Sequence, residues 1–266
     1  MRSGVVLGAL AATLLASRAV AAASDEPICA DRPGLATPTC TVPRGLVQVE
    51  TGLVDWVHDH SRGTGTDELV VGQTALKFGL NDRFHLEVDI TPYQRVHERD
   101  GASSISAGGF GDLELAAKYR LTTDPRPLKI ALRPSVKIPT ARRPLGNRAW
   151  EAALIVPLEY AVPRSQLSIG LSPELGLAAD DGGAGHHLTM TQVLGLAVPL
   201  ARRVNASVEI SGTWEWDSGG AVRQYVAGGS VAYLLSDDVQ IDAGISLGLN
   251  RSASDVELYS GLAFRF

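Results

Sequence analysis

The feature that most constrains this chain is an alternation of apolar with polar or small side chains at every second residue, which recurs in about a dozen segments of roughly ten residues. Residues 84–91 show it clearly, because His85, Glu87 and Asp89 alternate with apolar residues. A strand that crosses a bilayer needs roughly 9 to 11 residues, and a closed barrel leaves no unpaired backbone edge in lipid. The pattern therefore predicts an all-β transmembrane barrel with antiparallel, up-and-down strands rather than a soluble sandwich.

The alternation predicts twelve strands, an even number that brings both chain ends to the same side of the membrane. The expected strands cover residues 46–57, 68–80, 84–91, 112–121, 128–138, 150–162, 166–177, 188–200, 204–216, 222–235, 239–249 and 256–266. The connections at 81–83, 122–127, 163–165, 201–203 and 236–238 are expected to be periplasmic, and those at 58–67, 94–110, 139–149, 178–187, 217–220 and 250–255 to face outside.

Aromatic residues sort to the two ends of these strands, as expected for the two lipid interfaces. All four tryptophans fall at the outer ends, although Trp56 is in the inward phase of its strand. Prolines oppose the pattern, because proline cannot donate a ladder hydrogen bond. Each of these prolines is expected to mark a strand end, a bulge or a break: Pro92, Pro134, Pro157, Pro173 and Pro199.

The start of the chain has the layout of a secretory signal peptide. Arg2 precedes an uncharged run, and small residues follow at 19–23. The run is shorter than the roughly 18 residues of a spanning helix, which disfavours the alternative of a retained anchor. Residues 1–23 are therefore expected to be removed, and a Gram-negative outer membrane is the expected destination. Loss of Arg2 and Arg18 changes the formal net charge from −5 to −7, which argues against nucleic-acid binding.

The two cysteines, Cys29 and Cys40, both precede the first expected strand. An oxidising periplasm favours a disulfide between them. A lipid-anchor cysteine is the alternative, but Pro27 and Ile28 are unsuitable residues immediately before it. We expect residues 24–44 to form a periplasmic segment that enters or caps the barrel, which spans residues 45–266.

Several short strings resemble one known family. Residues 31–34 (DRPG), 41–45 (TVPRG) and 47–53 (VQVETGL) resemble the opening of the meta-pathway phenol-degradation family of outer-membrane proteins, and residues 109–113 (GFGDL) with 118–121 (KYRL) resemble a second motif of that family. Members are described as transporters or channels for aromatic or other hydrophobic compounds. The resemblance therefore implies a hydrophobic or aromatic solute.

Two further features bear on this resemblance. The final residue, Phe266, resembles the terminal signal by which barrel-assembly machinery recognises its clients, which implies that machinery as a partner. The usual opening of the family has no cysteine pair, so Cys29 and Cys40 depart from it.

Charged side chains fall mainly on the face expected to line the lumen. The predicted lumen-lining residues are His85, Glu87, Asp89, Glu114, Lys118, Arg120, Lys129, Arg133, Lys137, Glu151, Glu174, Glu209, Asp242 and Glu257. The basic ones gather on two adjacent strands, opposite a mostly acidic wall. Such a transverse field would orient a solute or hold an inward loop. The alternative is that the charges neutralise one another in a polar interior.

Histidines and serines give no enzyme or metal signature. His58 and His60 lie in one expected outer loop and His186 and His187 in another, but none has zinc-type spacing on a regular element. An outer-membrane lipid hydrolase would need a serine and histidine on the lipid-facing wall. The one histidine expected in a strand, His85, points inward, and there is no Gly-x-Ser-x-Gly elbow. We expect no catalysis, no metal and no cofactor.

Two functions from different classes fit these observations. The first is a channel or transporter for small molecules, in contact with outer-membrane lipid. A polar lumen disfavours axial diffusion of a hydrophobe, so a lateral exit between strands near Pro157 or Pro199 is the alternative route. The second function is a closed structural or surface-interaction barrel without transport.

Overall fold

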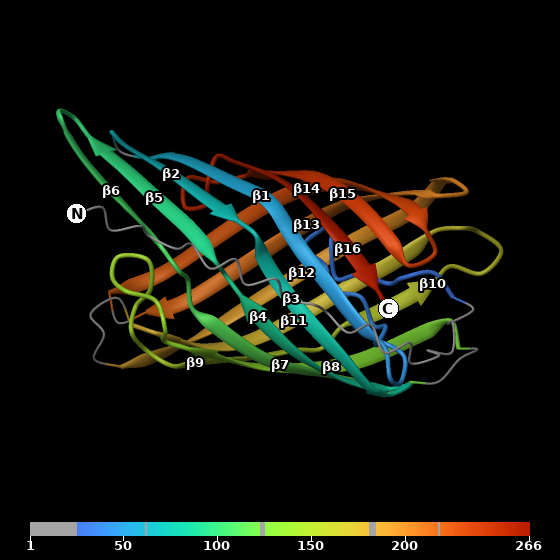
Figure 1. Ribbon diagram of the computed structural model, residues 1–266. Helices are drawn as coiled ribbons and strands as arrows, with labels where there is room; N and C mark the ends of the chain where they lie inside the picture. Colours follow the sequence, from blue (N-terminus) through green and yellow to red (C-terminus); the bar gives the residue numbers. More distant parts are fainter. Residues whose placement is uncertain (1–25, 62, 123–125, 181–184, 218) are drawn as a thin grey trace, which may run out of the picture.

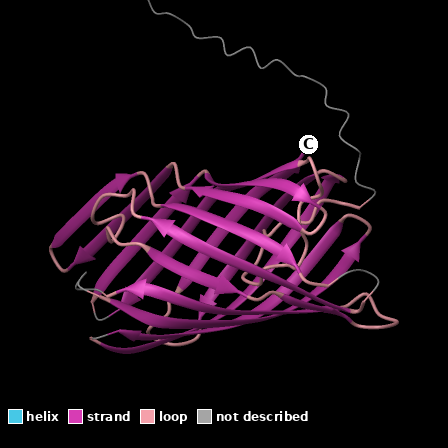
Figure 2. Cartoon of the chain, turned by 90° about the horizontal axis from the view of Figure 1, so that it is seen from below, coloured by secondary structure: helices cyan, strands magenta, loops and turns pink. Residues whose placement is uncertain are grey.

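The computed structural model describes residues 26–61, 63–122, 126–180, 185–217 and 219–266. The predicted signal peptide lies outside these residues. The chain forms a closed antiparallel β-barrel of twelve steeply tilted strands (Figures 1 and 2), as predicted. None of the described residues belongs to a helix long and apolar enough to cross a membrane.

Four of the twelve strands are each divided into two segments. The segments are β1 (Val47–Ser61), β2 (Thr64–Val71) with β3 (Gln73–Asn81), β4 (Phe84–Ile90) with β5 (Tyr93–Asp100), β6 (Ser103–Gly109) with β7 (Leu113–Arg120), β8 (Leu128–Ile138), β9 (Glu151–Ile155) with β10 (Leu158–Ala161), β11 (Ser168–Ala179), β12 (His186–Ala201), β13 (Val204–Asp217), β14 (Gly220–Ser236), β15 (Val239–Gly248) and β16 (Val256–Arg265). Pairing of β1 with β16 closes the barrel.

The barrel is apolar outside and polar inside, which is why the alternation could be seen in the sequence. On β12, Leu194 and Leu196 are exposed, 42% and 40% respectively. Lys77, His85 and Lys118 are almost fully buried, at 1% exposure or less. Lipid is as apolar as a protein core, so apolar side chains are stable on the outer face of the barrel. Charged side chains are not, and they must face the lumen.

The predicted outer loops at 58–67 and 94–110 are wrong, because most of these residues are strand. β1 pairs with β2 up to Ser61 and Thr64, and β5 pairs with β6 over residues 94–109. These hairpins reach beyond the neighbouring strands at the upper left of Figure 1. Their side chains include Asp67, Arg99 and Ser106, so backbone hydrogen bonds form the strands without an apolar face to reveal them in the sequence.

A β-bulge in β1 explains the exceptional phase of Trp56. The register of β1 against β16 shifts between Gly52 and Val54. Beyond the shift Asp55 pairs with Tyr259, which faces the lumen, and Trp56 pairs with the exposed Leu258. One extra residue inverts every later side chain of the strand, so Trp56 faces outward with the other tryptophans.

The prolines coincide with irregularities in the sheet. Pro92 lies between β4 and β5, and Pro157 between β9 and β10. Pro199 adjoins a register shift in the β12–β13 ladder. Pro134 and Pro173 lie inside β8 and β11 instead of ending them. Pro173 accepts a hydrogen bond from Val156 at 2.9 Å, next to the break in the neighbouring strand.

Candidate functional site

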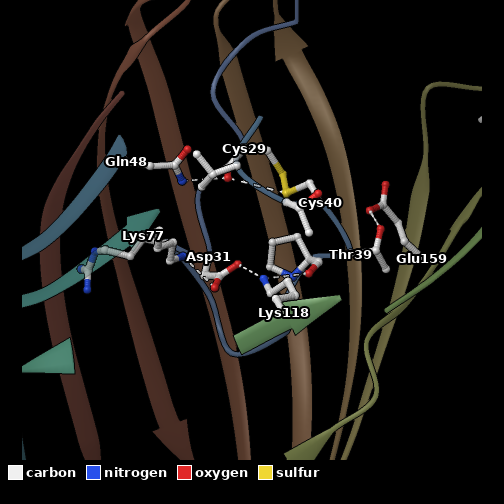
Figure 3. Close-up of a disulfide and its surroundings, with 12 residues drawn as sticks. Cys29, Asp31, Thr39, Cys40, Gln48, Lys77, Lys118 and Glu159 are labelled. Atoms are coloured by element: carbon white, nitrogen blue, oxygen red, sulfur yellow. Dashed lines mark hydrogen bonds and ion pairs between the residues drawn. A yellow bond between two sulfur atoms is a disulfide. The ribbon is translucent and has the colours of Figure 1, made fainter. Parts of the chain in front are cut away.

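The N-terminal segment, which we define as residues 26–46, runs through the barrel lumen at the end where the short turns at 81–83 and 236–238 lie (Figures 1 and 3). It contacts inward-facing residues on several sides of the wall. A disulfide joins Cys29 to Cys40, with their Cα atoms 6.4 Å apart. Gln48 of β1 donates a hydrogen bond of 3.0 Å to the Cys29 carbonyl. The disulfide therefore closes a loop that sits inside the barrel mouth.

Asp31 fixes one side of the N-terminal segment through two buried lysines (Figure 3). Its carboxylate is 2.7 Å from Nζ of Lys77 on β3 and also pairs with Lys118 on β7. Lys77 further pairs with Glu50 on β1. Burial alone would raise the pKa of Asp31, but the charges of Lys118 and Lys77 lower it well below its usual range. The carboxylate thus remains ionised and bridges two strands that do not pair with each other.

Arg32 fixes the segment next to the seam between β1 and β16. Its guanidinium is 3.3 Å from Asp242 on β15, and the Tyr259 ring centre is 5.9 Å away. It lies against Gly261, where an added Cβ would come within 2.2 Å of Nε. It also adjoins Gly52, where a Cβ would be 3.3 Å from the guanidinium. The absence of side chains at these two positions provides the space that Arg32 occupies.

The next residues bind Glu209 of β13 through backbone amides. Leu35 and Ala36 donate hydrogen bonds of 2.6 Å and 3.0 Å to its two carboxylate oxygens. Gly34 has φ of +114°, and a Cβ there would lie 2.7 Å from the carboxylate. Only glycine adopts this conformation readily and leaves room for the acid. Residues 31–34 (Asp-Arg-Pro-Gly) therefore make the contacts that hold the segment in place across the lumen.

Several of these residues were missed by the sequence analysis. Gln48, Glu50 and Lys77 line the lumen but were not among the predicted lumen residues, and no wall contact was assigned to Asp31 or Arg32. Lys77 could have been found from its position on the polar face of the second strand. The contacts of Asp31 and Arg32 had no local signal, and only the match of residues 31–34 to a family motif pointed to them.

Strand register places all of the predicted lumen-lining residues on the inner face: His85, Glu87, Asp89, Glu114, Lys118, Arg120, Lys129, Arg133, Lys137, Glu151, Glu174, Glu209, Asp242 and Glu257. Their role in a solute path stays a prediction. The predicted transverse field is largely neutralised, because Lys118 pairs with Asp31, Lys137 with Glu151, and Arg133 with acids of β4 and β7.

Arg133 shows this neutralisation most clearly. It lies 3.0 Å from Glu87, 3.5 Å from Asp89 and 3.2 Å from Glu114. One cation thus joins three carboxylates from β4 and β7. This cluster crowds the wall beside Lys118, and it stiffens the side of the lumen to which Asp31 binds.

The histidines all lie in strands, so the expectation that His85 alone does so is wrong. His85 is buried in the lumen and accepts a 3.0 Å hydrogen bond from the Val42 amide at Nδ1. It therefore holds the N-terminal segment instead of facing lipid, where a hydrolase would need it. His58 lies 2.8 Å from Asp67, and His186 lies 2.8 Å from the Trp150 carbonyl.

One group of residues at the outer rim has the composition of a metal site. Within the described part of the chain, donor atoms of Asp180, His187 and Asp217 lie within 4.8 Å of one another. His187 and Asp180 are 3.0 Å apart, and this hydrogen bond is sufficient to explain their proximity. We assign no metal to the group.

Known structures share this architecture. The chain is similar to the COG4313 outer membrane channel from Pseudomonas putida F1, with a TM-score of 0.69, 15% identity, and coverage of 88% of this chain and 99% of that one. The translocator domain of the autotransporter NalP from Neisseria meningitidis has a TM-score of 0.53 and 12% identity, with coverage of 89% of this chain and 90% of that one. The NanC porin has a TM-score of 0.51 and 8% identity, with coverage of 82% of this chain and 98% of that one. These likenesses establish the fold, that of a porin-like barrel of the bacterial outer membrane.

Sequence comparison establishes the family. The search of curated proteins gave no match. Residues 30–266 match the family model described as "Putative MetA-pathway of phenol degradation", which includes all of the barrel and all but the first residues of the N-terminal segment. The chain therefore belongs to this family of phenol-degradation outer-membrane barrels, as the motifs at 31–53 and 109–121 predicted.

Proposed function

We propose that this protein is an outer-membrane channel for small molecules, and that the N-terminal segment is a plug that closes its periplasmic end. The observation that carries this proposal is the position of the segment inside a barrel that closes without it. The β1–β16 ladder completes the wall on its own. Removing the segment from the lumen would therefore break none of the ladders that hold the barrel together.

The contacts of the segment suit a plug that can leave. Most join polar groups to the wall: Asp31 to two lysines, Arg32 to Asp242, and the Leu35 and Ala36 amides to Glu209. Water can replace such partners once the lumen fills, since the net contribution of a hydrogen bond to a charged group is only about 1.5 to 3 kcal/mol.

The proposed solutes are hydrophobic or aromatic small molecules. The family description, which names phenol degradation, supports this class. Outer-membrane lipid and the barrel-assembly machinery are the other proposed partners, and the protein is proposed not to be an enzyme. A lateral exit near Pro157 or Pro199 is a second route to consider. Replacing either proline by alanine without any effect on uptake would rule that route out.

The test is single-channel conductance of the refolded mature chain in a planar bilayer, with and without a reductant that opens the Cys29–Cys40 disulfide. Stable conductance steps that grow on reduction would support a plugged channel. The Cys29→Ser/Cys40→Ser variant should reproduce the reduced state without reductant. Silence of both the reduced chain and this variant would contradict an openable channel.

The second candidate function is a closed structural or surface-interaction barrel. The observation that favours it is the cluster of Arg133 with three carboxylates, which together with the N-terminal segment crowds the lumen. The conductance experiment separates the two candidates, because only the channel opens when the segment is released.

A further inference from the structure

One part of the lumen wall carries no large side chain. Register places Ser168 of β11, Ala197 of β12, Ser207 of β13 and Ser230 of β14 in one row, each paired directly with the next. The adjacent row contains Gly170 paired with Gly195, with Glu159 and Glu209 at its two ends. Small residues on these strands therefore form a recess in the wall between two carboxylates.

The N-terminal segment faces this surface without filling the space before it. Pro33, Ala36 and Pro38 of the segment line a cavity of about 350 Å³ together with the small residues of the wall. An added Cβ at Gly170 would be 3.8 Å from the Ala36 Cβ, so the two surfaces meet at the inner end of the cavity.

Most of the polar groups around the cavity are already bonded within the protein, and an exception is the buried Arg32 Nε, which lies against Gly261. The Ser207 and Ser230 hydroxyls are 2.6 Å apart, and Ser168 donates a 3.2 Å hydrogen bond to Glu159. Glu209 accepts the two backbone amides of the segment, and Gln240 donates to the Arg32 carbonyl at 2.9 Å. A cavity in which most polar groups are satisfied offers few hydrogen bonds to water and favours a mostly apolar guest.

Size and position then define the guest. A dry cavity of 150 Å³ holds benzene, so about 350 Å³ has room for a substituted ring. The lining includes Asn205, which lies beside the periplasmic turn at 202–203, so the cavity is at the periplasmic end of the barrel.

We infer that this cavity, between the N-terminal segment and the wall of β11 to β14, is a binding site for one uncharged, mostly apolar molecule of single-ring size. The inference deepens the proposed function and rests on it, since it assigns the place where a solute pauses behind the plug. Charged side chains on β3, β7, β13 and β15 position the plug, and the small residues of β11 to β14 take the solute.

Binding of fluorobenzene, followed by ¹⁹F NMR with the full mature chain in lipid nanodiscs, tests this inference. Partitioning into lipid is the same for every variant, so the signal of interest is the saturable component that excess toluene displaces. Ala197→Phe places a ring in the middle of the small-residue row and should abolish that component. Ala153→Phe is the matched control, because Ala153 lines a separate cavity of about 200 Å³ towards the outer end.

The wild type and Ala153→Phe should both show displaceable binding, and Ala197→Phe should not. Equal binding by Ala197→Phe, or no saturable component in the wild type, would overturn the inference. If Ala197→Phe does not fold, Ser207→Leu fills the same row from the next strand and replaces it. Because binding is measured without conduction, its absence would leave the conductance result, and with it the proposed channel, untouched.

Discussion

Gly52 and Gly261 are direct partners across the β1–β16 ladder that closes the barrel, and the Arg32 guanidinium lies against both. A side chain at position 261 would occupy the place of Nε, at 2.2 Å. The strand pair that completes the wall thus also holds the N-terminal segment in place.

Gly261→Ala should weaken the seat of the plug and raise the open probability in planar bilayers, because the new methyl group displaces Arg32 from Asp242. The matched control is Gly229→Ala, which adds the same methyl group to β14, where the nearest atom is 3.8 Å away. The same conductance in both variants would contradict the assigned role of Arg32.

Asp31→Asn should release the plug more strongly, because it leaves Lys118 buried without its carboxylate partner. Removing one partner of a buried ion pair costs about 3 to 5 kcal/mol. Faster cleavage of the N-terminal segment by a protease added on the periplasmic side would measure the release. Cleavage at the wild-type rate would show that the lysines find other partners.

Acidification should leave the plug seated until the pH is low. The folded-state pKa of Asp31 lies below its ordinary value of 3.8, so its stabilising contribution is complete above that value and is lost as the pH falls further. Conductance should therefore be flat from about pH 7 to pH 5 and rise only below about pH 4. Asp31→Asn should lack this component. A rise near pH 6 that depends on Asp31 would contradict the lowered pKa.

Arg133→Gln should make the open lumen more selective for cations, since it removes the charge that neutralises Glu87, Asp89 and Glu114. The reversal potential of the reduced channel in a KCl gradient measures this change. Arg202→Gln removes the same charge from a periplasmic turn outside the lumen and should alter selectivity less. Equal shifts would show that the lumen cluster does not lie on the ion path.

The transmembrane part of the fold could be predicted from the sequence because lipid imposes one rule on every strand. An apolar residue must face outward at each second position, so residues such as Leu194 and Leu196 indicate both the presence of a strand and which of its faces points outward. Outside the lipid this rule ends, so the sequence predicts loops where β5, β6 and the first residues of β2 form hairpins. The bulge at Leu53 was hidden for a related reason, since one residue inverts the pattern without interrupting it.

The candidate site could be predicted only in part. His85, Lys118 and Glu209 were expected in the lumen because each occupies the polar phase of a strand. Their partners in the N-terminal segment were not, because the segment has no periodicity and its contacts are distant in sequence. Arg32 and Asp242, for example, are separated by 210 residues.

That separation fixes an order of events during biogenesis. The segment that carries Arg32 is synthesised before any strand, yet Asp242 and Gly261 belong to the last strands, and Gly52 meets Gly261 only when the barrel closes. The part of the chain that is made first can thus reach its final position only after the last strand is in place, so a seated Arg32 reports that the barrel is complete.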